Sequence, residues 1–320
     1  MAAITPTNVY PQGRSGPRIE RVDPATRDVA LAVLLTGSAT GSSAAVEQFL
    51  QFTEAQKLSL DELWAVFEGD KPVASVLVVP SAGRTAMTFL SPTLSVVSRV
   101  LHMELLLRAC RGQDPRQVHL IQGLLDPEQH AQRRVMEDAG FFHLADLVYM
   151  QRGAERSPAQ IDLSDMDLLL SPWSEDWRGL FARAIESSYE QTLDCPGLLG
   201  LRRIDDVIDG HMGMGRFDPQ MWFVLHRGDE PAGVMLMNEV THRQAYELVY
   251  LGLTPPYRGK GLARRLLRYG LGRVSEKRGT SLLLAVDKEN TPALRLYRRE
   301  GFGVTGYKCA MLYIHDQNGV

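Results

Sequence analysis

The residues best suited to chemistry lie in a glycine-rich segment that follows an apolar run. The run Leu248–Leu253 stops at two prolines, and Arg258-Gly259-Lys260-Gly261 then leads into an amphipathic stretch. Glycine lets a backbone approach a ligand closely, and the first amides of a helix have no intrahelical acceptor. Because the helix dipole also favours negative charge there, this turn is typical of an anion site, with a diphosphate as the natural ligand.

Two other phosphate-binding patterns fit this segment poorly. A dinucleotide fingerprint needs a third glycine at the position after Ala263, where the sequence has Arg264. A P-loop needs a Gly-Lys-Ser/Thr ending that is missing here. The remaining alternative is a glycine-containing turn that binds nothing and precedes a solvated basic helix.

A second motif begins at Asn290, further along the chain, in the run NTPALRLYRREGF. With both motifs in this order and at this spacing, the sequence resembles the GNAT superfamily of N-acetyltransferases over roughly residues 245–303. The family's coenzyme pattern, [QR]-x-x-G-x-[GA], and its later pattern, N-x-x-A-x-x-x-Y-x-x-x-G-F, are matched by Arg258, Gly261, Ala263, Asn290, Ala293, Tyr297, Gly301 and Phe302. The resemblance implies an acetyl-CoA-dependent acyltransferase that passes acetyl to a primary amine by direct attack.

The same resemblance implies which residues contact the coenzyme. Backbone amides of residues 258–263 would hold the diphosphate, and the end of the preceding strand would pair with the pantetheine arm. Asn290 would touch that arm or a water beside the thioester. Arg264, Arg265 and Arg298 are candidates for the 3′-phosphate, or else exposed helix arginines. The expected coenzyme set is Leu251, Gly252, Leu253, Arg258, Gly259, Lys260, Gly261, Leu262, Ala263, Arg264, Asn290, Ala293 and Tyr297.

Acetyl transfer to an amine needs a neutral amine, a stabilised carbonyl oxygen and a proton for the leaving thiolate. Tyr297 matches the family tyrosine that commonly gives this proton to sulfur, and its alternative role is a buried structural tyrosine. A strand amide near Leu251 or Leu253 would polarise the carbonyl.

Glu247 is the expected base. Strand alternation predicts that it shares a face with Val249, Leu251 and Leu253, and apolar neighbours would raise its pKa towards neutrality. Its alternative is an exposed glutamate at the start of a strand. Glu239 and His211 are the reserve candidates.

The turn-rich residues 192–222 lie where the family places its acceptor-binding loops. Their acidity would suit a cationic amine, although acidic helix starts are also common without a ligand. A nucleophilic Cys195 would need a His–Asn or His–Asp partner that spacing does not identify, so direct transfer is expected. The side chains considered in this stretch are Asp194, Cys195, Asp205, Asp206, Asp209 and His211.

The elements that position these residues occur twice along the chain. When Gly140 is aligned with Gly301, Asp126 falls on Asp287, and both halves show the same predicted strand-to-helix junction. We therefore expect an α/β (α+β) chain of two tandem GNAT-like domains, each a mixed, mostly antiparallel sheet flanked by helices. The expected limits are a flexible tail at 1–17, a degenerate N-terminal domain at 18–152 and a catalytic C-terminal domain at 161–317.

The first copy lacks the chemistry of the second. No glycine lies between Gly83 and Gly112, and in the same alignment Ala86 replaces the glutamate and Met136 replaces the tyrosine. We expect this copy to be catalytically silent, and to pack on the active copy and shape its acceptor pocket. Binding of a regulatory ligand is the alternative.

Composition narrows the class of protein. The chain has 320 residues, of which 44% are hydrophobic and 23% charged, and lacks an apolar stretch typical of a membrane span. Three cysteines without a paired spacing predict neither a disulfide framework nor a metal site. The net charge of −3 gives no general attraction to nucleic acid or membrane. We expect a cytoplasmic protein.

Charge is distributed unevenly along the second half. Residues 253–308 contain 13 Lys or Arg and 4 Asp or Glu, whereas residues 156–252 contain 8 and 16. A basic lobe suits a polyanionic coenzyme. The sequence therefore predicts an N-acetyltransferase with acetyl-CoA as co-substrate, a small-molecule amine as acceptor and no metal. A non-catalytic CoA-binding sensor or scaffold and a peptide or protein acetyltransferase remain the alternatives, and the oligomeric state is not indicated.

Overall fold

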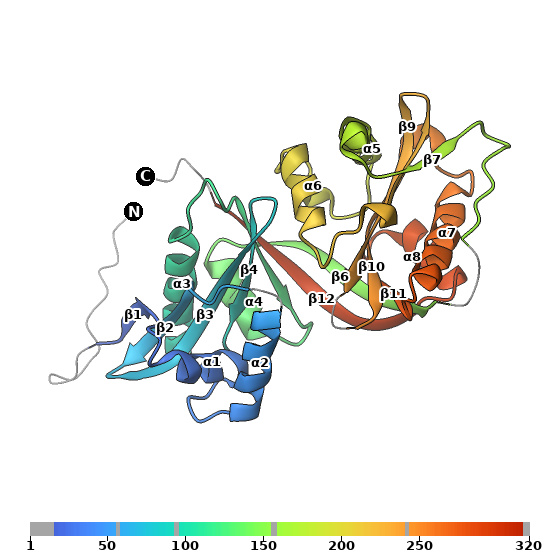
Figure 1. The fold of residues 1–320 in the computed structure, drawn as a ribbon. Helices are drawn as coiled ribbons and strands as arrows, with labels where there is room; N and C mark the ends of the chain where they lie inside the picture. Colours follow the sequence, from blue (N-terminus) through green and yellow to red (C-terminus); the bar gives the residue numbers. More distant parts are fainter. Residues whose placement is uncertain (1–15, 56–57, 93–95, 155–158, 241–242, 316–320) are drawn as a thin grey trace, which may run out of the picture.

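The computed structural model describes residues 16–55, 58–92, 96–154, 159–240 and 243–315 (Figure 1). Most of the tail expected at 1–17 lies outside these residues. The first half comprises β1 (Arg18–Arg21), α1 (Arg27–Thr36), α2 (Ser43–Ala55), β2 (Leu63–Glu68), β3 (Lys71–Ser81), β4 (Thr85–Leu90), α3 (Val96–Arg111), β5 (Leu120–Leu125), α4 (His130–Asp138) and β6 (Phe142–Gly153).

The second half repeats these elements in the same order. It comprises β7 (Leu169–Pro172), α5 (Arg178–Ser188), α6 (Ile204–Met212), β8 (Trp222–Arg227), β9 (Glu230–Val240), β10 (Ala245–Leu253), α7 (Leu262–Glu276), β11 (Ser281–Asp287), α8 (Thr291–Arg299) and β12 (Gly303–Ile314). Aligning Gly140 with Gly301 carries β6 onto β12 and α4 onto α8 without a shift at either end. The mixed α/β fold and the duplication predicted from the sequence are confirmed.

All the strands join in one 12-stranded sheet, in the order β1-β2-β3-β4-β5-β12-β6-β11-β10-β9-β8-β7. Each of the strands β1 to β6 has a counterpart among β7 to β12. When every strand is exchanged for its counterpart, the same order is obtained, read from the opposite edge of the sheet. Most neighbours are antiparallel, and the parallel pairs are β4 with β5 and β10 with β11. The two halves are therefore related as two copies facing each other across the middle of the sheet.

The last strand of each half completes the sheet of the other half. β6 pairs with β11 from Gly153↔Ser281 to Leu147↔Asp287, and β12 pairs with β5 from Cys309↔Leu125 to Ile314↔Leu120. Figure 1 shows both strands running between the two lobes. Strand pairing thus crosses the limits expected at 152 and 161, and those limits remain a prediction.

Helices cover both faces of the second lobe's sheet. On one face α7 buries Leu262, Leu266, Leu267 and Val274 at helical spacing, together with α8. On the other face α5 and α6 enclose an aromatic cluster, in which Trp173 contacts Phe181 with ring centroids 4.8 Å apart. This two-sided packing fixes β10 and α7, which carry the candidate site.

The turn between β3 and β4 of the first lobe packs on α6 of the second lobe. Gly83 adopts φ +74, and a Cβ atom there would come within 2.8 Å of the backbone N and Cα of Gly210, and closer still to the carbonyl of Asp206. Arg84 forms an ion pair of 3.8 Å with Asp206 and donates to the carbonyl of Pro115 at 2.8 Å. The first lobe therefore sets the position of α6.

None of the helices in the described ranges has the length and apolar character needed to cross a membrane.

Candidate functional site

The candidate site lies where the parallel strands β10 and β11 separate. Their ladder contains the pairs Ala245↔Ser281, Tyr246↔Leu282 and Glu247↔Leu283, although β10 continues to Leu253 and β11 to Asp287. A bulge at Val249, seen as a register shift against β9, accompanies the separation. Beyond Glu247 the backbone edge of β10 that faces β11 is left open for a partner in extended conformation.

A cavity of about 900 Å³ occupies this opening. Its lining contains twelve of the thirteen expected coenzyme residues: Leu251, Gly252, Leu253, Arg258, Gly259, Gly261, Leu262, Ala263, Arg264, Asn290, Ala293 and Tyr297. Lys260 is outside the lining, and its Nζ lies 5.5 Å from the ring centroid of Tyr257. Two motifs that are well separated in sequence thus meet at one cavity.

The glycine turn at the mouth of this cavity has space above it. Gly259 and Gly261 adopt φ +73 and +79, a backbone region that other residues rarely enter, and a Cβ on either would meet nothing within 4 Å. Among the described residues, no hydrogen-bond acceptor pairs with the amides of 259–264. The amide of Arg258, by contrast, donates to the carbonyl of Pro255 at 3.2 Å, so the amides available to an anion begin at Gly259.

Arg258 instead joins two elements. Its Nε donates to the carbonyl of Leu253 and its Nη2 to the carbonyl of Ser188, both at 3.0 Å. These bonds hold the end of β10 against the end of α5. Gly252 permits the close approach, because a Cβ there would overlap the side chains of Ser188 and Tyr250.

The arginines that line the cavity differ in part from the three candidates that the sequence suggested for the 3′-phosphate. Arg264 lines it, with Nε donating to Glu300 Oε1 at 2.5 Å, whereas Arg265 is tied to Asp165 at 2.6 and 2.8 Å. Neither Arg265 nor Arg298 is in the lining. Arg295 and Arg299 are, and sequence analysis missed them, although their positions one turn apart on a single helix face were a usable signal.

Tyr297 is 7% exposed, and its ring packs on Phe302 with centroids 5.6 Å apart. Burial, with a smaller effect from Asp194, raises the pKa of the Tyr297 phenol, so the hydroxyl stays protonated at neutral pH and is able to donate. Asn290 caps α8, since its Oδ1 accepts from the amide of Ala293 at 3.3 Å.

Glu247 does not lie on the face of the sheet that strand alternation predicted. Tyr246 and Leu248 point into the core on the α7 side, as do Leu251 and Leu253 after the bulge, so Glu247 faces the opposite side of the sheet. The prediction that it shares a face with Leu251 and Leu253 was wrong, because the bulge reverses the alternation. Glu247 lines neither cavity, although burial raises its pKa. Of the reserve candidates, Glu239 is held in an ion pair with Arg216.

A second cavity of about 370 Å³ adjoins the first and shares Thr192, Asp194, Val249 and Tyr250 with it. Three of the six side chains considered in residues 192–222 line it: Asp194, Cys195 and His211. The other three point elsewhere, since Asp205 and Asp209 pair with Arg178 and Asp206 pairs with Arg84.

Two of these residues have strongly shifted pKa values. Burial raises the pKa of the Cys195 thiol to about 12, with Asp194 and Asp287 adding to it, so the thiol is a poor nucleophile. Burial lowers the pKa of His211 to about 3, which leaves its ring neutral. Asp194 Oδ1 accepts from the amide of Asp287 at 3.2 Å, and burial raises its pKa.

The first lobe differs from the second at the position equivalent to Tyr297. Met136, at the position of Tyr297, is fully buried and its thioether lies against Gly123, leaving no room for a Cβ on that glycine. The ladder between β4 and β5 runs to Thr88↔Gly123, close to the end of β4.

One group in the described part of the chain has the donor atoms of a metal site: His143, Asp146 and Cys309, whose ligand atoms lie within 4.8 Å of one another. Cysteine spacing did not indicate it, because two strands contribute. His143 Nε2 contacts Asp146 Oδ1 at 3.1 Å, and the Cys309 thiol donates to the sulfur of Met311 at 3.7 Å.

Comparison with known proteins agrees with this geometry. Residues 180–302 match the model of the acetyltransferase (GNAT) family. Mycothiol acetyltransferase of Streptomyces bingchenggensis (strain BCW-1) is 32% identical over 117 residues, which cover 37% of this chain and 36% of that protein. Spermidine N(1)-acetyltransferase of Escherichia coli (strain K12) is 30% identical over 118 residues, which cover 36% and 60%. The chain thus spans between about a third and three fifths of the length of these relatives.

The fold as a whole also has a counterpart among solved structures. A tandem GNAT protein from the clavulanic acid biosynthesis pathway, solved without AcCoA, matches with a TM-score of 0.51 and 12% identity over 95% of this chain and 100% of that one. At this identity the likeness is one of fold, and it extends over both lobes. The chain is therefore two-lobed, residues 180–302 match the acetyltransferase (GNAT) family model, and the fold over both lobes is similar to that of a tandem GNAT protein.

Proposed function

We propose that this chain is an acetyl-CoA-dependent N-acetyltransferase that works in its second lobe and passes the acetyl group to a primary amine of a small molecule. The observation that carries the proposal is the opening between β10 and β11, with the unpaired amides of residues 259–264 at its mouth. An extended acyl carrier with a diphosphate fits both features, because one end needs an open strand edge and the other a turn of free amides.

Binding follows from the cavity. The amides of 259–264 hold the diphosphate, and the open edge of Leu251–Leu253 pairs with the pantetheine arm, which brings the thioester to the bulge of β10. Arg264, Arg295 and Arg299 add positive charge along the wall. Arg258 positions the strand end and does not itself meet the phosphates.

Chemistry then needs one bond made and one broken. The neutral amine attacks the thioester carbon, a β10 amide stabilises the oxygen as it gains charge, and the carbon–sulfur bond breaks. Tyr297 gives its proton to the departing sulfur, which suits a buried phenol that stays protonated at neutral pH.

Two half-buried carboxylates are available to take the proton from the amine. Glu247 stands at the last paired position before the strands separate, and Asp194 lies where the two cavities meet. Burial raises the pKa of both towards the range useful for a base. We retain Glu247 as the proposed base, acting through water because it lines neither cavity, with Asp194 as its competitor.

The first lobe supports the second and does no chemistry of its own in this proposal. Its Gly83 turn rests on α6, and α6 supplies Ile204, Val207 and His211 to the second cavity. The silent copy would therefore act on the acceptor pocket and leave coenzyme binding to the other lobe.

Calorimetry with acetyl-CoA, followed by detection of free thiol on adding an amine, tests the proposal. Gly261→Glu places a negative charge in the turn and should abolish coenzyme binding. Gly228→Glu is the matched control, because Gly228 also has a positive φ and open space around it but belongs to the β8–β9 turn. Binding that survives Gly261→Glu contradicts the proposal. Binding without turnover on a broad amine panel would instead favour a sensor or scaffold.

A further inference from the structure

The second cavity contains polar groups that have no partner among the described residues. It is enclosed by the loop after α5, by α6 and by the bulged part of β10, and it shares Asp194 with the lining of the first cavity. Apolar side chains, among them Leu198, Val207 and Val249, form part of its wall. Such a mixture of apolar wall and few polar groups is typical of a small-molecule site.

Arg202 is the first of these groups. Its side chain is partly buried and lines the second cavity only, away from the coenzyme. Within the described ranges no hydrogen bond or ion pair involves its guanidinium, whereas Arg178, Arg216 and Arg265 of the same lobe each have a carboxylate partner. A guanidinium is a fork of donors matched to a carboxylate, so an unpaired one inside a cavity indicates an anionic ligand group.

His211 is the second group. Its Nε2 is shielded from solvent and has no hydrogen-bond partner in the described part of the chain. The ring stacks on Tyr250, with centroids 5.7 Å apart, and it stays neutral because burial lowers its pKa to about 3. A buried nitrogen without a partner costs free energy, and a ligand that pairs with it recovers that cost.

Asp194 supplies the opposite charge at the other end. It lines both cavities, so it lies on the coenzyme side, whereas Arg202 and His211 line the second cavity alone. A cationic amine held at Asp194 is directed towards the thioester, and the remainder of the molecule extends towards Arg202. Glu186, also at the second cavity, is exposed and lies at its rim.

We propose that the acceptor is a small amino carboxylate: an amino acid or a similarly compact molecule with a primary amine at one end and a carboxylate at the other. This inference rests on the proposed function and narrows its substrate. Asp194 receives the amine, Arg202 binds the carboxylate, and the volume of about 370 Å³ admits an apolar side chain of moderate size. A polyamine, which has positive charges alone, would be repelled by Arg202.

Matched acceptors test the inference. Leucine, phenylalanine and lysine are compared with their decarboxylated forms, isoamylamine, 2-phenylethylamine and cadaverine, in the thiol-release assay. The wild-type chain should prefer at least one amino acid over its decarboxylated amine by at least about 10-fold in kcat/KM, the scale of one charged hydrogen-bonded pair. Calorimetric binding of the same acid to the CoA-bound protein gives a readout that does not depend on turnover.

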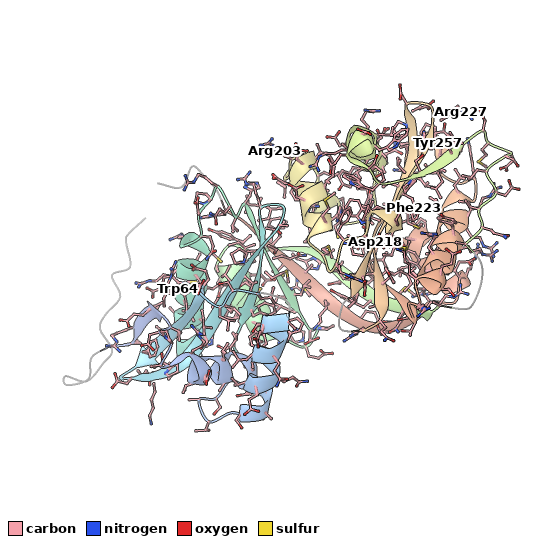
Figure 2. The ribbon with its side chains drawn as sticks, viewed as in Figure 1. Trp64, Arg203, Asp218, Phe223, Arg227 and Tyr257 are labelled. Atoms are coloured by element: carbon pink, nitrogen blue, oxygen red, sulfur yellow. The ribbon has the colours of Figure 1, made fainter. Side chains whose placement is uncertain are left out.

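Arg202→Gln should lower kcat/KM for that amino acid by roughly 10- to 100-fold and leave its decarboxylated partner within about two-fold. The matched control is Arg203→Gln, since Arg203 is exposed, lines neither cavity and lies at the outer end of α6 (Figure 2). Arg202→Lys should restore part of the discrimination.

Three results would overturn the inference, by two different routes. If acetyl-CoA binds and the decarboxylated amines are preferred, or if Arg202→Gln lowers both members of a pair equally, the amino carboxylate assignment is wrong and the acetyltransferase proposal stands. If acetyl-CoA does not bind at all, the proposed function fails and the acceptor assignment fails with it.

Discussion

Replacing Gly83 by alanine tests whether the first lobe controls the acceptor pocket. Gly83 adopts φ +74, and an alanine Cβ would lie 2.8 Å from the backbone N and Cα of Gly210 on α6. Carbon atoms pack at about 3.5–4.0 Å, so α6 has to retreat by roughly 1 Å. The left-handed backbone adds strain of about 1–2 kcal/mol.

Gly69→Ala separates the strain from the displacement. Gly69 lies in the β2–β3 turn of the same lobe with φ +62, and nothing stands within 4 Å of its missing Cβ. Both variants should lose about 1–2 kcal/mol of unfolding free energy in urea titrations, and Gly83→Ala somewhat more because its new methyl overlaps α6.

Activity should distinguish the two variants. Because α6 carries His211 into the second cavity, a shift of roughly 1 Å there should lower kcat/KM for the acceptor by roughly 10- to 100-fold. The dissociation constant for acetyl-CoA, measured by calorimetry, should stay within about two-fold, since no part of α6 lines the first cavity. If Gly83→Ala and Gly69→Ala turn out equally active, the first lobe does not act through α6.

The other predictions concern the chemistry and one ionic contact. Tyr297→Phe should lower kcat by about 100-fold with little change in coenzyme affinity, whereas Tyr307→Phe, an exposed tyrosine, should leave both unchanged in steady-state assays. The pKa of Glu247 is raised, so kcat/KM should increase with pH as this carboxyl group loses its proton. Glu247→Gln should remove this limb of the pH profile, and Asp194→Asn should keep it. The reverse result would identify Asp194 as the base. Burial opposes ionisation of Glu300, but hydrogen bonds from Arg268 and Arg264 hold its pKa below 4.5. The ionised carboxylate therefore stabilises the fold above about pH 4.5, and this stabilisation is lost in acid. Glu300→Gln should lower the unfolding free energy in urea by about 2 kcal/mol near neutral pH and by little in acid, and an equal loss at both pH values would contradict the ionic role.

Motifs that are continuous in sequence predicted most of the lining of the first cavity. The glycine turn and the α8 motif each depend on backbone conformation within a few residues, so Gly259, Gly261, Asn290 and Tyr297 were all found from local patterns. Spacing could also have indicated Arg295 and Arg299, which face the cavity one turn apart.

Features that depend on distant parts of the chain were not predictable in this way. The bulge at Val249 arises from the register of β10 against β9, and simple alternation therefore put Glu247 on the wrong face. In the sequence Arg202 cannot be told from other loop arginines; only the structure shows that it lines a cavity and has no carboxylate partner among the described residues. The exchange of β6 and β12 could not be predicted either. The two strands occupy equivalent positions in their copies, so local sequence does not indicate which of the two sheets each strand joins.

That exchange has a consequence for synthesis of the chain on the ribosome. After β5 and β6 have left the ribosome, β5 still lacks its pairing partner in β12, Cys309–Ile314. These residues are synthesised only after nearly all of the second half. At about 5–20 residues per second this delay is roughly ten to thirty seconds, during which the nascent first half has an unpaired sheet edge. The first half is also difficult to lose by truncation, since its removal would take β6 from the sheet of the second half. Two copies that complete each other's sheets can diverge in their side chains, but neither can be deleted alone.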